Sequence, residues 1–178
     1  EISLRKAIEL KSDFAEAHSN LGTILKDLGK SQEAELSYRK AIELKPNLAD
    51  SHYNLGFIFK DLGKLQEAEL SIRKAIEIKP DFANAHSNLG VILKDLGKLQ
   101  EAELSTRKAI ELNPNYTKAH SNLGDILSNL GRLKEAEIST RKAIKLNPYF
   151  ADAHLNLGNI LYSLEKLKEA ELSTHKAI

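Results

Sequence analysis

Residues 15–48 read AEAHSNLGTILKDLGKSQEAELSYRKAIELKPNL, and this pattern returns every 34 residues along the chain. Further copies occupy residues 49–82, 83–116 and 117–150, residues 151–178 hold a truncated copy, and residues 1–14 match the trailing helix of a preceding one. A fixed period of this length indicates one supersecondary unit stacked on itself, because each copy buries its apolar face against the next. We therefore expect a single repeat array over residues 1–178, and we number the positions of each repeat 1–34.

Apolar spacing and helix-ending residues predict two helices in every repeat. Positions 3, 7, 10, 11 and 14 are mostly apolar, which is the spacing of one buried helix face, and Gly usually follows at position 15. Gly there can adopt the left-handed conformation that ends a helix, which we term helix A. Helix B begins near position 17, and the Pro at position 32 prevents it from continuing. The sequence therefore predicts an all-α solenoid of antiparallel helix pairs.

Two further repeated features concern the packing of the helices. Gly at position 8 lies in the middle of helix A, where it costs roughly 1 kcal/mol relative to Ala, so a close approach of helix B is expected there. Glu at position 21 and Arg at position 25, as in Glu35 and Arg39, are four residues apart on helix B. We expect these pairs to lie on a solvated face and to contribute only about 0.2–0.5 kcal/mol each.

Composition argues against several classes of function. The 26 Lys and Arg residues nearly balance 25 Asp and Glu residues, and a net charge of +1 does not favour binding to nucleic acid or to a membrane surface. No apolar run approaches the roughly 18 residues of a membrane span. The absence of Cys excludes disulfides and thiolate metal sites. We expect a cytoplasmic segment of a longer protein that binds no cofactor.

The recurring residues resemble the tetratricopeptide repeat (TPR) family over the whole chain. Within the family, the stretch HSNLGxILKDLGKLQEAE is similar to the arrays attached to O-GlcNAc-transferase-like glycosyltransferases and to long bacterial arrays. The resemblance implies a right-handed superhelical solenoid, in which the A helices line a concave groove that binds peptides or protein segments. In the first repeat the residues that carry the resemblance are Leu21, Gly22, Gly29, Ala34, Ala41 and Pro46.

Some residues depart from the family pattern toward the C-terminal end. Glu165 stands at position 15, where the other repeats have Gly, and Thr106, Thr140 and Thr174 stand at position 24, where a larger residue such as Tyr38 is usual. We expect these departures to loosen the packing of the C-terminal repeats without changing the fold.

The face of helix A opposite the core is the candidate binding surface, and its most regular feature is Asn at position 6. Asn is a poor helix former, but its amide both donates and accepts hydrogen bonds, which suits it to a peptide backbone of any sequence. If A helices lie about 10 Å apart, one Asn meets about every third residue of an extended chain. These residues are Asn20, Asn54, Asn88, Asn122 and Asn156.

The resemblance adds that matching Asn residues hold peptide backbones in the transferase-type arrays, with positions 2, 5, 6, 9, 12 and 13 lining the groove. The alternative is that each Asn only bonds a neighbouring repeat, or that repeat duplication copied it passively.

Variable positions of the same face indicate where specificity resides. Tyr53 and Phe57 are four residues apart and form either a candidate hot spot for a partner or a packed wall of the groove. Position 12 carries Lys26, Lys60 and Lys94, which are further candidate contacts, and neutral residues replace Lys in the C-terminal repeats.

Other signals are interpreted as structural. His recurs at position 4, from His18 to His154, but only once per helix A, so we expect it to pack and not to bind metal, which needs three or four converging ligands. Basic residues that would clamp a chaperone C-terminal carboxylate are absent from positions 5 and 6. No nucleophile, base and orienting group converge by spacing, so we expect no catalytic site within these residues.

Three functions remain open on the sequence alone. The first is a non-catalytic scaffold that binds extended protein segments along the A helices. The second is the substrate-selecting arm of a larger transferase. The third is a module that self-associates through its uncapped ends, because solenoids with exposed ends associate.

Overall fold

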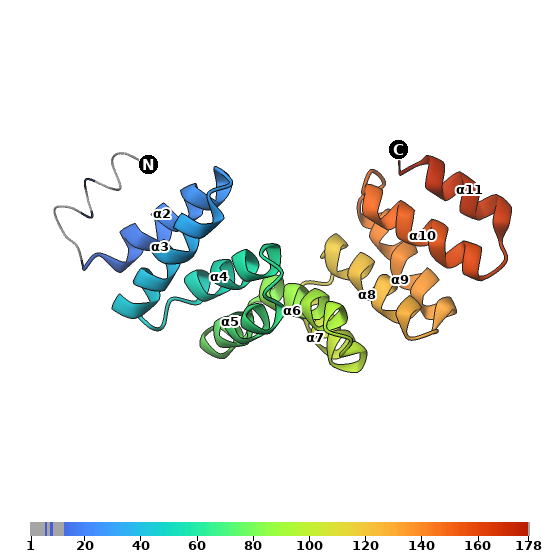
Figure 1. Cartoon of the computed structure of the whole chain (residues 1–178). Coiled ribbons are helices and arrows are strands. Elements are labelled where there is room, and N and C mark those ends of the chain that lie inside the picture. Colours follow the sequence, from blue (N-terminus) through green and yellow to red (C-terminus); the bar gives the residue numbers. More distant parts are fainter. Residues whose placement is uncertain (1–5, 7, 9–12, 178) are drawn as a thin grey trace. The chain divides into compact units, whose positions relative to one another are not determined.

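The computed structural model describes residues 6, 8 and 13–177, and every regular element in this part of the chain is a helix (Figure 1). The A helices are α2 (Ala15–Asp27), α4 (Ala49–Asp61), α6 (Ala83–Asp95), α8 (Thr117–Asn129) and α10 (Ala151–Ser163). The B helices are α3 (Ser31–Leu44), α5 (Leu65–Ile78), α7 (Leu99–Leu112), α9 (Leu133–Leu146) and α11 (Leu167–His175). The prediction of an all-α solenoid of helix pairs is confirmed, whereas the helix expected at residues 1–14 falls largely outside the described residues.

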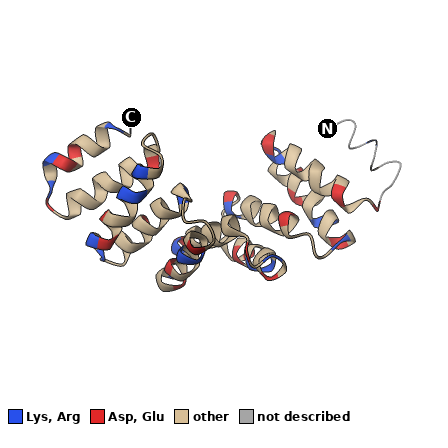
Figure 2. Ribbon diagram, turned by 180° about the vertical axis from the view of Figure 1, so that it is seen from behind, with Lys and Arg blue, Asp and Glu red and all other residues tan. Residues whose placement is uncertain are grey.

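The chain forms two compact units, Glu1–Ala85 and His86–Ile178, and α6 begins in the first and ends in the second. Within each unit, helix A packs against helix B of its own repeat and against helix B of the repeat before it. In the second unit, Leu123, Leu127 and Ile160 form one buried apolar cluster that spans two repeats. None of the helices described is both long and apolar enough to cross a membrane. Acidic and basic residues are interspersed along the helices of both units (Figure 2).

The turn between helix A and helix B depends on a residue in the left-handed conformation. Gly at position 15 has φ between 73° and 77° in the first four repeats, as the sequence led us to expect. Glu165 occupies the same turn of the fifth repeat with a φ of 61°. It keeps the same hydrogen bond, since the Lys166 N–H donates to the Leu161 carbonyl over 2.9 Å, as the Lys30 N–H donates to Leu25. Glu165 thus preserves the turn in a conformation that costs a residue with a Cβ about 1–2 kcal/mol.

Gly at position 8 marks the closest approach of the two helices in a repeat. A Cβ on Gly56 would lie 2.7 Å from Cγ1 of Ile72 and 3.2 Å from the carbonyl oxygen of Ala68. A Cβ on Gly124 would meet the hydroxyl of Thr140 at a still shorter distance. Ile72 and Thr140 stand at position 24 of helix B, and Ala68 stands at position 20. The absence of a side chain at position 8 therefore lets the backbones of helices A and B come together. The close approach of helix B that was expected at this mid-helix Gly is confirmed.

Position 24 of helix B fills the space that Gly leaves open. Tyr38, Ile72, Thr106 and Thr140 are all fully buried, and the Thr hydroxyls donate to the carbonyl four residues earlier. The hydroxyl of Tyr38 donates to Thr23 Oγ1 at 3.1 Å, and burial raises the pKa of Tyr38. In the third and fourth repeats the smaller Thr therefore fits a fully buried site.

The Glu at position 21 joins consecutive repeats, which the sequence did not predict. Glu103 accepts hydrogen bonds from Arg107 Nε at 2.8 Å, on its own helix, and from Arg132 Nη1 at 2.6 Å, in the turn of the next repeat. Glu137 accepts equivalent bonds from Arg141 and Lys166, both at 2.9 Å. The expectation of a solvated Glu–Arg ladder was wrong for the Glu residues, because the position 16 cation of the following repeat covers them.

The cations on either side of Glu103 and Glu137 lower the pKa values of these two carboxyl groups. Burial opposes ionisation of Glu103, but hydrogen bonds from Arg107 and Arg132 outweigh it and lower its pKa. The hydrogen bond from Lys166 is the largest cause that lowers the pKa of Glu137, and burial opposes it. We call these carboxylates, with the cations on either side, the ionic bridges between repeats.

Substituting Gly124 by Ala should destabilise the fold. Ala favours helix by about 1 kcal/mol, but overpacking against the buried Thr140 hydroxyl and the Ala136 carbonyl costs roughly 1–3 kcal/mol. Thermal unfolding of Gly124→Ala should therefore occur at a lower temperature. The loss should be smaller in a Thr140→Ala background, which removes the hydroxyl. A variant with a raised unfolding temperature would show that the helices can separate without cost.

The ionic bridges should make stability depend on pH in the acid range. A carboxyl group whose pKa is lowered by folding stabilises the protein above its ordinary pKa of 4.5, and this stabilisation is lost as the pH falls through the lowered value. Glu103→Gln and Glu137→Gln should therefore be less stable than the parent at neutral pH, measured by urea unfolding, and the difference should shrink below a pH of about 4.5.

The matched control is Glu171→Gln. Glu171 occupies position 21 of the fifth repeat, is exposed and forms no ion pair with any described residue. An equal loss of stability in this control would contradict the bridging role.

Candidate functional site

The candidate surface is the face of the A helices opposite the core, and two of its Asn residues in the second unit bond the preceding repeat. Asn122 Nδ2 donates to Ser87 Oγ at 3.2 Å, and Asn156 Nδ2 donates to Ser121 Oγ at 3.1 Å. Both Ser residues stand at position 5 and are almost fully buried. One N–H of each of these amides is therefore committed to holding two A helices together. The second N–H and the carbonyl oxygen form no hydrogen bond with described residues.

The Asn residues of the first unit have different surroundings. Ser51 Oγ donates to Ser19 Oγ at 2.8 Å, so the position 5 hydroxyl of the first repeat is engaged by position 3 of the second. Asn20 is exposed and Asn54 is half-buried, and neither forms a hydrogen bond within the described part of the chain. Asn88, at the start of the second unit, is half-buried. Position 6 is thus accessible in every repeat, but it has a packing role only in some.

The aromatic pair is packed on one side and accessible on the other. The Tyr53 ring lies 4.8 Å from the Phe82 ring, centroid to centroid, at an interplanar angle of 38°. The Lys26 ammonium group lies 5.7 Å from the centre of the Phe57 ring. Tyr53 and Phe57 are both half-buried. Tyr53 therefore belongs to the wall of the surface, and Phe57 lies beneath a lysine of the preceding repeat.

The lysines at position 12 reach position 9 of the following repeat. Lys26 lies over Phe57 in the first unit, and Lys94 Nζ lies 2.7 Å from a carboxylate oxygen of Asp125 in the second. Burial opposes the charge of Lys94, but the hydrogen bond that it donates to Asp125 raises its pKa above the ordinary value. Lys60 is half-buried and forms no bond with described residues. Lys94 is thus bound by an internal partner, whereas Lys60 is available.

Leu155 and Tyr162 on α10 stand at positions that vary between repeats, and the sequence did not assign them to the site. Leu155 is 48% exposed and Tyr162 is 70% exposed. They are separated by seven residues, so with Asn159 between them they share one face of the helix. A Leu at position 5 and a Tyr at position 12, where other repeats have mostly Ser and Lys, were the sequence signals. This face adds an exposed apolar strip to the candidate surface.

The position 4 His residues bond the chain at the end of helix B. The Nε2 atoms of His52, His120 and His154 each lie 2.9 Å from the carbonyl oxygen of the Pro six residues earlier. Since a carbonyl oxygen accepts, Nε2 carries the proton in each case. Among the residues that the structure describes, no three His, Asp or Glu side chains converge as metal ligands. These His residues fix the turn that leads from helix B into the next helix A.

Comparison with protein-family models gives matches to tetratricopeptide repeats. A model described as "TPR repeat" matches residues 22–63, and models described as "Tetratricopeptide repeat" match residues 49–82, 83–116 and 106–138. Together these matches cover residues 22–138. Comparison with functionally curated proteins gives no match.

Several solved structures share the fold of this chain. The crystal structure of YrrB, described as a TPR protein with an unusual peptide-binding site, is 28% identical with a TM-score of 0.78, covering 98% of this chain and 90% of YrrB. A crystal structure of MamA is 26% identical with a TM-score of 0.77, covering 88% of this chain and 91% of MamA. PilF of Pseudomonas aeruginosa, at 24% identity and a TM-score of 0.82, shares the fold over 92% of this chain and 74% of its own. With its paired helices, mid-helix Gly and matching family models, the chain belongs to the tetratricopeptide repeat family of protein-interaction scaffolds.

Proposed function

We propose that this chain binds extended segments of partner proteins along the faces of its A helices, with the position 6 Asn amides contacting the partner backbone. The observation that carries the proposal is the amide geometry in the second unit. One N–H of Asn122 is held by Ser87, so the side chain is fixed while its carbonyl oxygen remains open to a donor. A preorganised amide loses little conformational entropy on binding, which favours its use as a contact.

The bond to Ser also weighs against a purely structural role for Asn. An interface between A helices needs one donor, and a shorter side chain with a single hydroxyl could supply it. Asn adds an acceptor and a second donor that no described residue of the chain uses. In the first unit, Asn54 and Asn20 recur without any such bond, so packing alone does not account for them.

The neighbouring residues would give each repeat its own preference. Lys60 offers an unpaired charge, Phe57 a half-buried ring, and Leu155 with Tyr162 an exposed apolar strip. Backbone contacts from Asn and variable side-chain contacts beside them suit a partner that is extended. The likeness to YrrB, described as having a peptide-binding site, supports the same class of ligand.

Substituting the Asn residues should separate binding from folding. With an extended peptide selected from a displayed random library on this chain, Asn54→Ala should weaken binding by about 1 kcal/mol and leave thermal stability unchanged or slightly raised. Asn122→Ala should weaken binding and also lower stability by about 0.5–1.5 kcal/mol, because the bond to Ser87 is lost. Calorimetric titration and thermal unfolding measure the two effects.

The control for this series is Asn47→Ala, since Asn47 is exposed in the turn after α3 and not on an A helix. Asn47→Ala should change neither the affinity for the selected peptide nor the thermal stability. If selected peptides bind Asn54→Ala and Asn122→Ala as tightly as the parent, the backbone contact is refuted.

Phe57 should behave as a binding residue and Tyr53 as a packing residue. Phe57→Ala should weaken peptide binding by about 2 kcal/mol and cost only about 1 kcal/mol of stability, since its ring is half-buried. Tyr53→Ala should cost more stability, because the ring contact with Phe82 is lost. A loss of roughly 3–5 kcal/mol of stability in Phe57→Ala would assign that ring to the core.

A further inference from the structure

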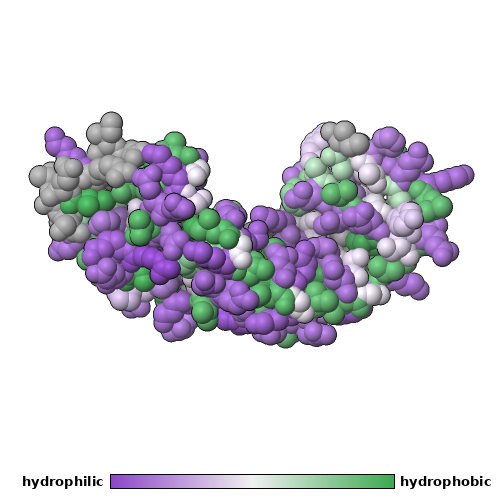
Figure 3. Space-filling view, in the orientation of Figure 1, coloured by the Kyte–Doolittle hydropathy of each residue, from purple (hydrophilic) through white to green (hydrophobic). Residues whose placement is uncertain are grey.

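Each of the described B helices carries a large apolar residue at the same position that folding does not bury. It stands at position 22 and is 59–72% exposed in each repeat. An isolated exposed apolar residue is ordinary on a protein surface, but its recurrence at the same position of successive B helices is a regular feature within each unit. The residues are Leu36, Leu70, Leu104, Ile138 and Leu172. Hydrophobic residues lie scattered among hydrophilic ones on the face seen in Figure 3.

Grooves lie between consecutive B helices, beside these residues. Between α3 and α5 the groove holds about 530 Å³, between α7 and α9 about 610 Å³, and between α9 and α11 about 310 Å³. The floor of each is formed by the helix A that lies between the two B helices. Long ionic side chains span these gaps, as Arg132 and Lys166 do from the turns before α9 and α11, whereas the A helices of the second unit bond each other directly.

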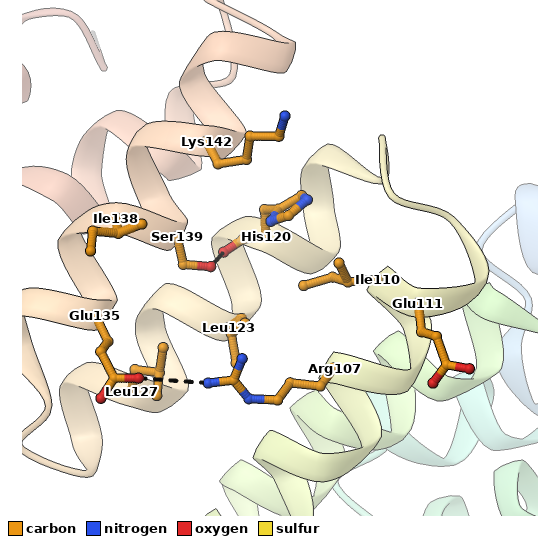
Figure 4. Close-up of a pocket in the computed structure, with 10 residues that line it drawn as sticks. All are labelled: Arg107, Ile110, Glu111, His120, Leu123, Leu127, Glu135, Ile138, Ser139 and Lys142. Atoms are coloured by element: carbon orange, nitrogen blue, oxygen red, sulfur yellow. Dashed lines mark hydrogen bonds and ion pairs between the residues drawn. The ribbon is translucent and has the colours of Figure 1, made fainter.

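The groove between α7 and α9 combines an apolar interior with a polar rim (Figure 4). Leu123 and Leu127 of α8 form its floor, and Ile110 and Ile138 lie on its two walls. Arg107 pairs with Glu135 across one end of the groove, at 3.8 Å. Lys142 extends along the α9 side. The groove is thus open, apolar at its base and charged at its edges.

Helix α9 differs from the preceding B helices in charge. Helices α3, α5 and α7 each carry three Glu and two basic residues, whereas α9 carries two Glu and four basic residues. The difference arises at Lys134, which replaces Gln, and at Lys145, which replaces the Glu found at position 29 of the first three repeats. The net charge of this helix is therefore positive where that of its counterparts is negative.

The substitution at position 29 also leaves cations without partners. In α5 and α7 the position 26 lysine pairs with the position 29 Glu, as Lys74 does with Glu77 at 2.7 Å and Lys108 with Glu111 at 2.6 Å. In α9 the equivalent residues are Lys142 and Lys145, and neither forms an ion pair or hydrogen bond with any described residue. Ile138, Lys142 and Lys145 follow one another at helical spacing, so they form a single stripe along α9. Ile138 and Lys142 line the groove between α7 and α9, whereas Lys145 lines the groove between α9 and α11.

The carboxylates on the same rim are already paired. Glu111 is bonded by Lys108, and Glu135 accepts from Arg132 Nη2 at 2.6 Å. The charge that this groove presents without compensation is therefore positive. Its complement is a ligand that is apolar on one side and acidic on the other.

We propose that the groove between α7 and α9 docks an amphipathic helix of a partner protein, with leucine-like residues on Ile138 and the groove floor and carboxylates facing Lys142. Two parallel walls of 14 residues each extend about 21 Å, which matches a helix of about 14 residues laid between them. Helix-in-groove recognition uses this combination of apolar anchors and flanking charges. The site lies on the B helices and is separate from the A-helix surface proposed above.

Two other anionic partners fit less well. A membrane surface would meet the exposed Ile138, but it could not reach Leu123 and Leu127 at the base of the groove. Duplex nucleic acid is bound chiefly through phosphates by several cations, and it would leave the apolar floor of Leu123 and Leu127 without a partner. An amphipathic acidic helix can fill the apolar floor and place carboxylates beside Lys142.

The test uses the whole chain and two stapled, fluorescein-labelled helical peptides with leucines on one face. One peptide carries Glu on its polar face and the other carries Lys. By fluorescence anisotropy, the acidic peptide should bind at least about tenfold more tightly than the basic one. Ile138→Ser should weaken its binding about tenfold. Lys145→Glu should weaken it about fivefold, because it would give Lys142 the carboxylate partner that the position 26 lysine has in α5 and α7.

Matched controls separate this site from other effects. Ile138 is 72% exposed and Leu70, at the same position of α5, is 70% exposed, so both Ser variants should fold, as circular dichroism would verify. Leu70→Ser should leave acidic-peptide binding within about twofold of the parent, because α5 lacks the cationic stripe. Asn54→Ala should also leave it unchanged, which distinguishes this site from the A-helix surface.

Several results would overturn the proposal. Absence of acidic-peptide binding, equal binding of the two peptides, or an equal loss in Leu70→Ser would each do so. Binding to phosphatidylserine vesicles or to a DNA duplex that is lost in Lys145→Glu, without acidic-peptide binding, would assign the stripe to that ligand instead.

Discussion

The fold depends on one close contact, between the middle of helix A and helix B of the same repeat. The position 8 Gly brings the helix backbones so near that a Cβ on Gly56 would lie 3.2 Å from the Ala68 carbonyl oxygen. The contact sets the geometry of the pair and leaves position 24 to fill the remaining space, with Tyr, Ile or Thr according to the repeat. Since each pair is built alike, the next repeat meets the same surface and the stacking can continue.

Local features of the fold could be read from the sequence, while contacts between repeats could not. Helix ends follow from Gly at position 15 and Pro at position 32, which act through the backbone of their own repeat. The burial of Glu103 could not be inferred, because Arg132 reaches it from 29 residues away. Likewise, the sequence singled out Asn122 but left open whether it bonds a neighbour or a ligand. Its bond to Ser87 depends on how two A helices are set side by side.

The two faces of the array differ because consecutive A helices and consecutive B helices are joined differently. In the second unit the A helices meet through short side chains, Asn and Ser, which bring the helices together and leave a row of amides at the surface. Consecutive B helices are instead bridged by the long side chains of Arg, Lys and Glu, and grooves lie between these helices, above helix A. A closely set row suits an extended chain, and a wide groove suits a helix.

Positions that depart from the repeat are where the repeats acquire different ligand preferences. A residue kept in every copy maintains the packing common to all, as Gly at position 8 does, so it cannot distinguish one repeat from another. Position 9 shows the consequence of variation: Phe57 places a ring beneath Lys26, whereas Asp125 binds Lys94 and removes its charge from the surface. Position 29 works in the opposite sense, because Lys145 removes a carboxylate that would have neutralised Lys142. On one scaffold, single substitutions thus withdraw a charge on the A-helix face and expose one on the B-helix face.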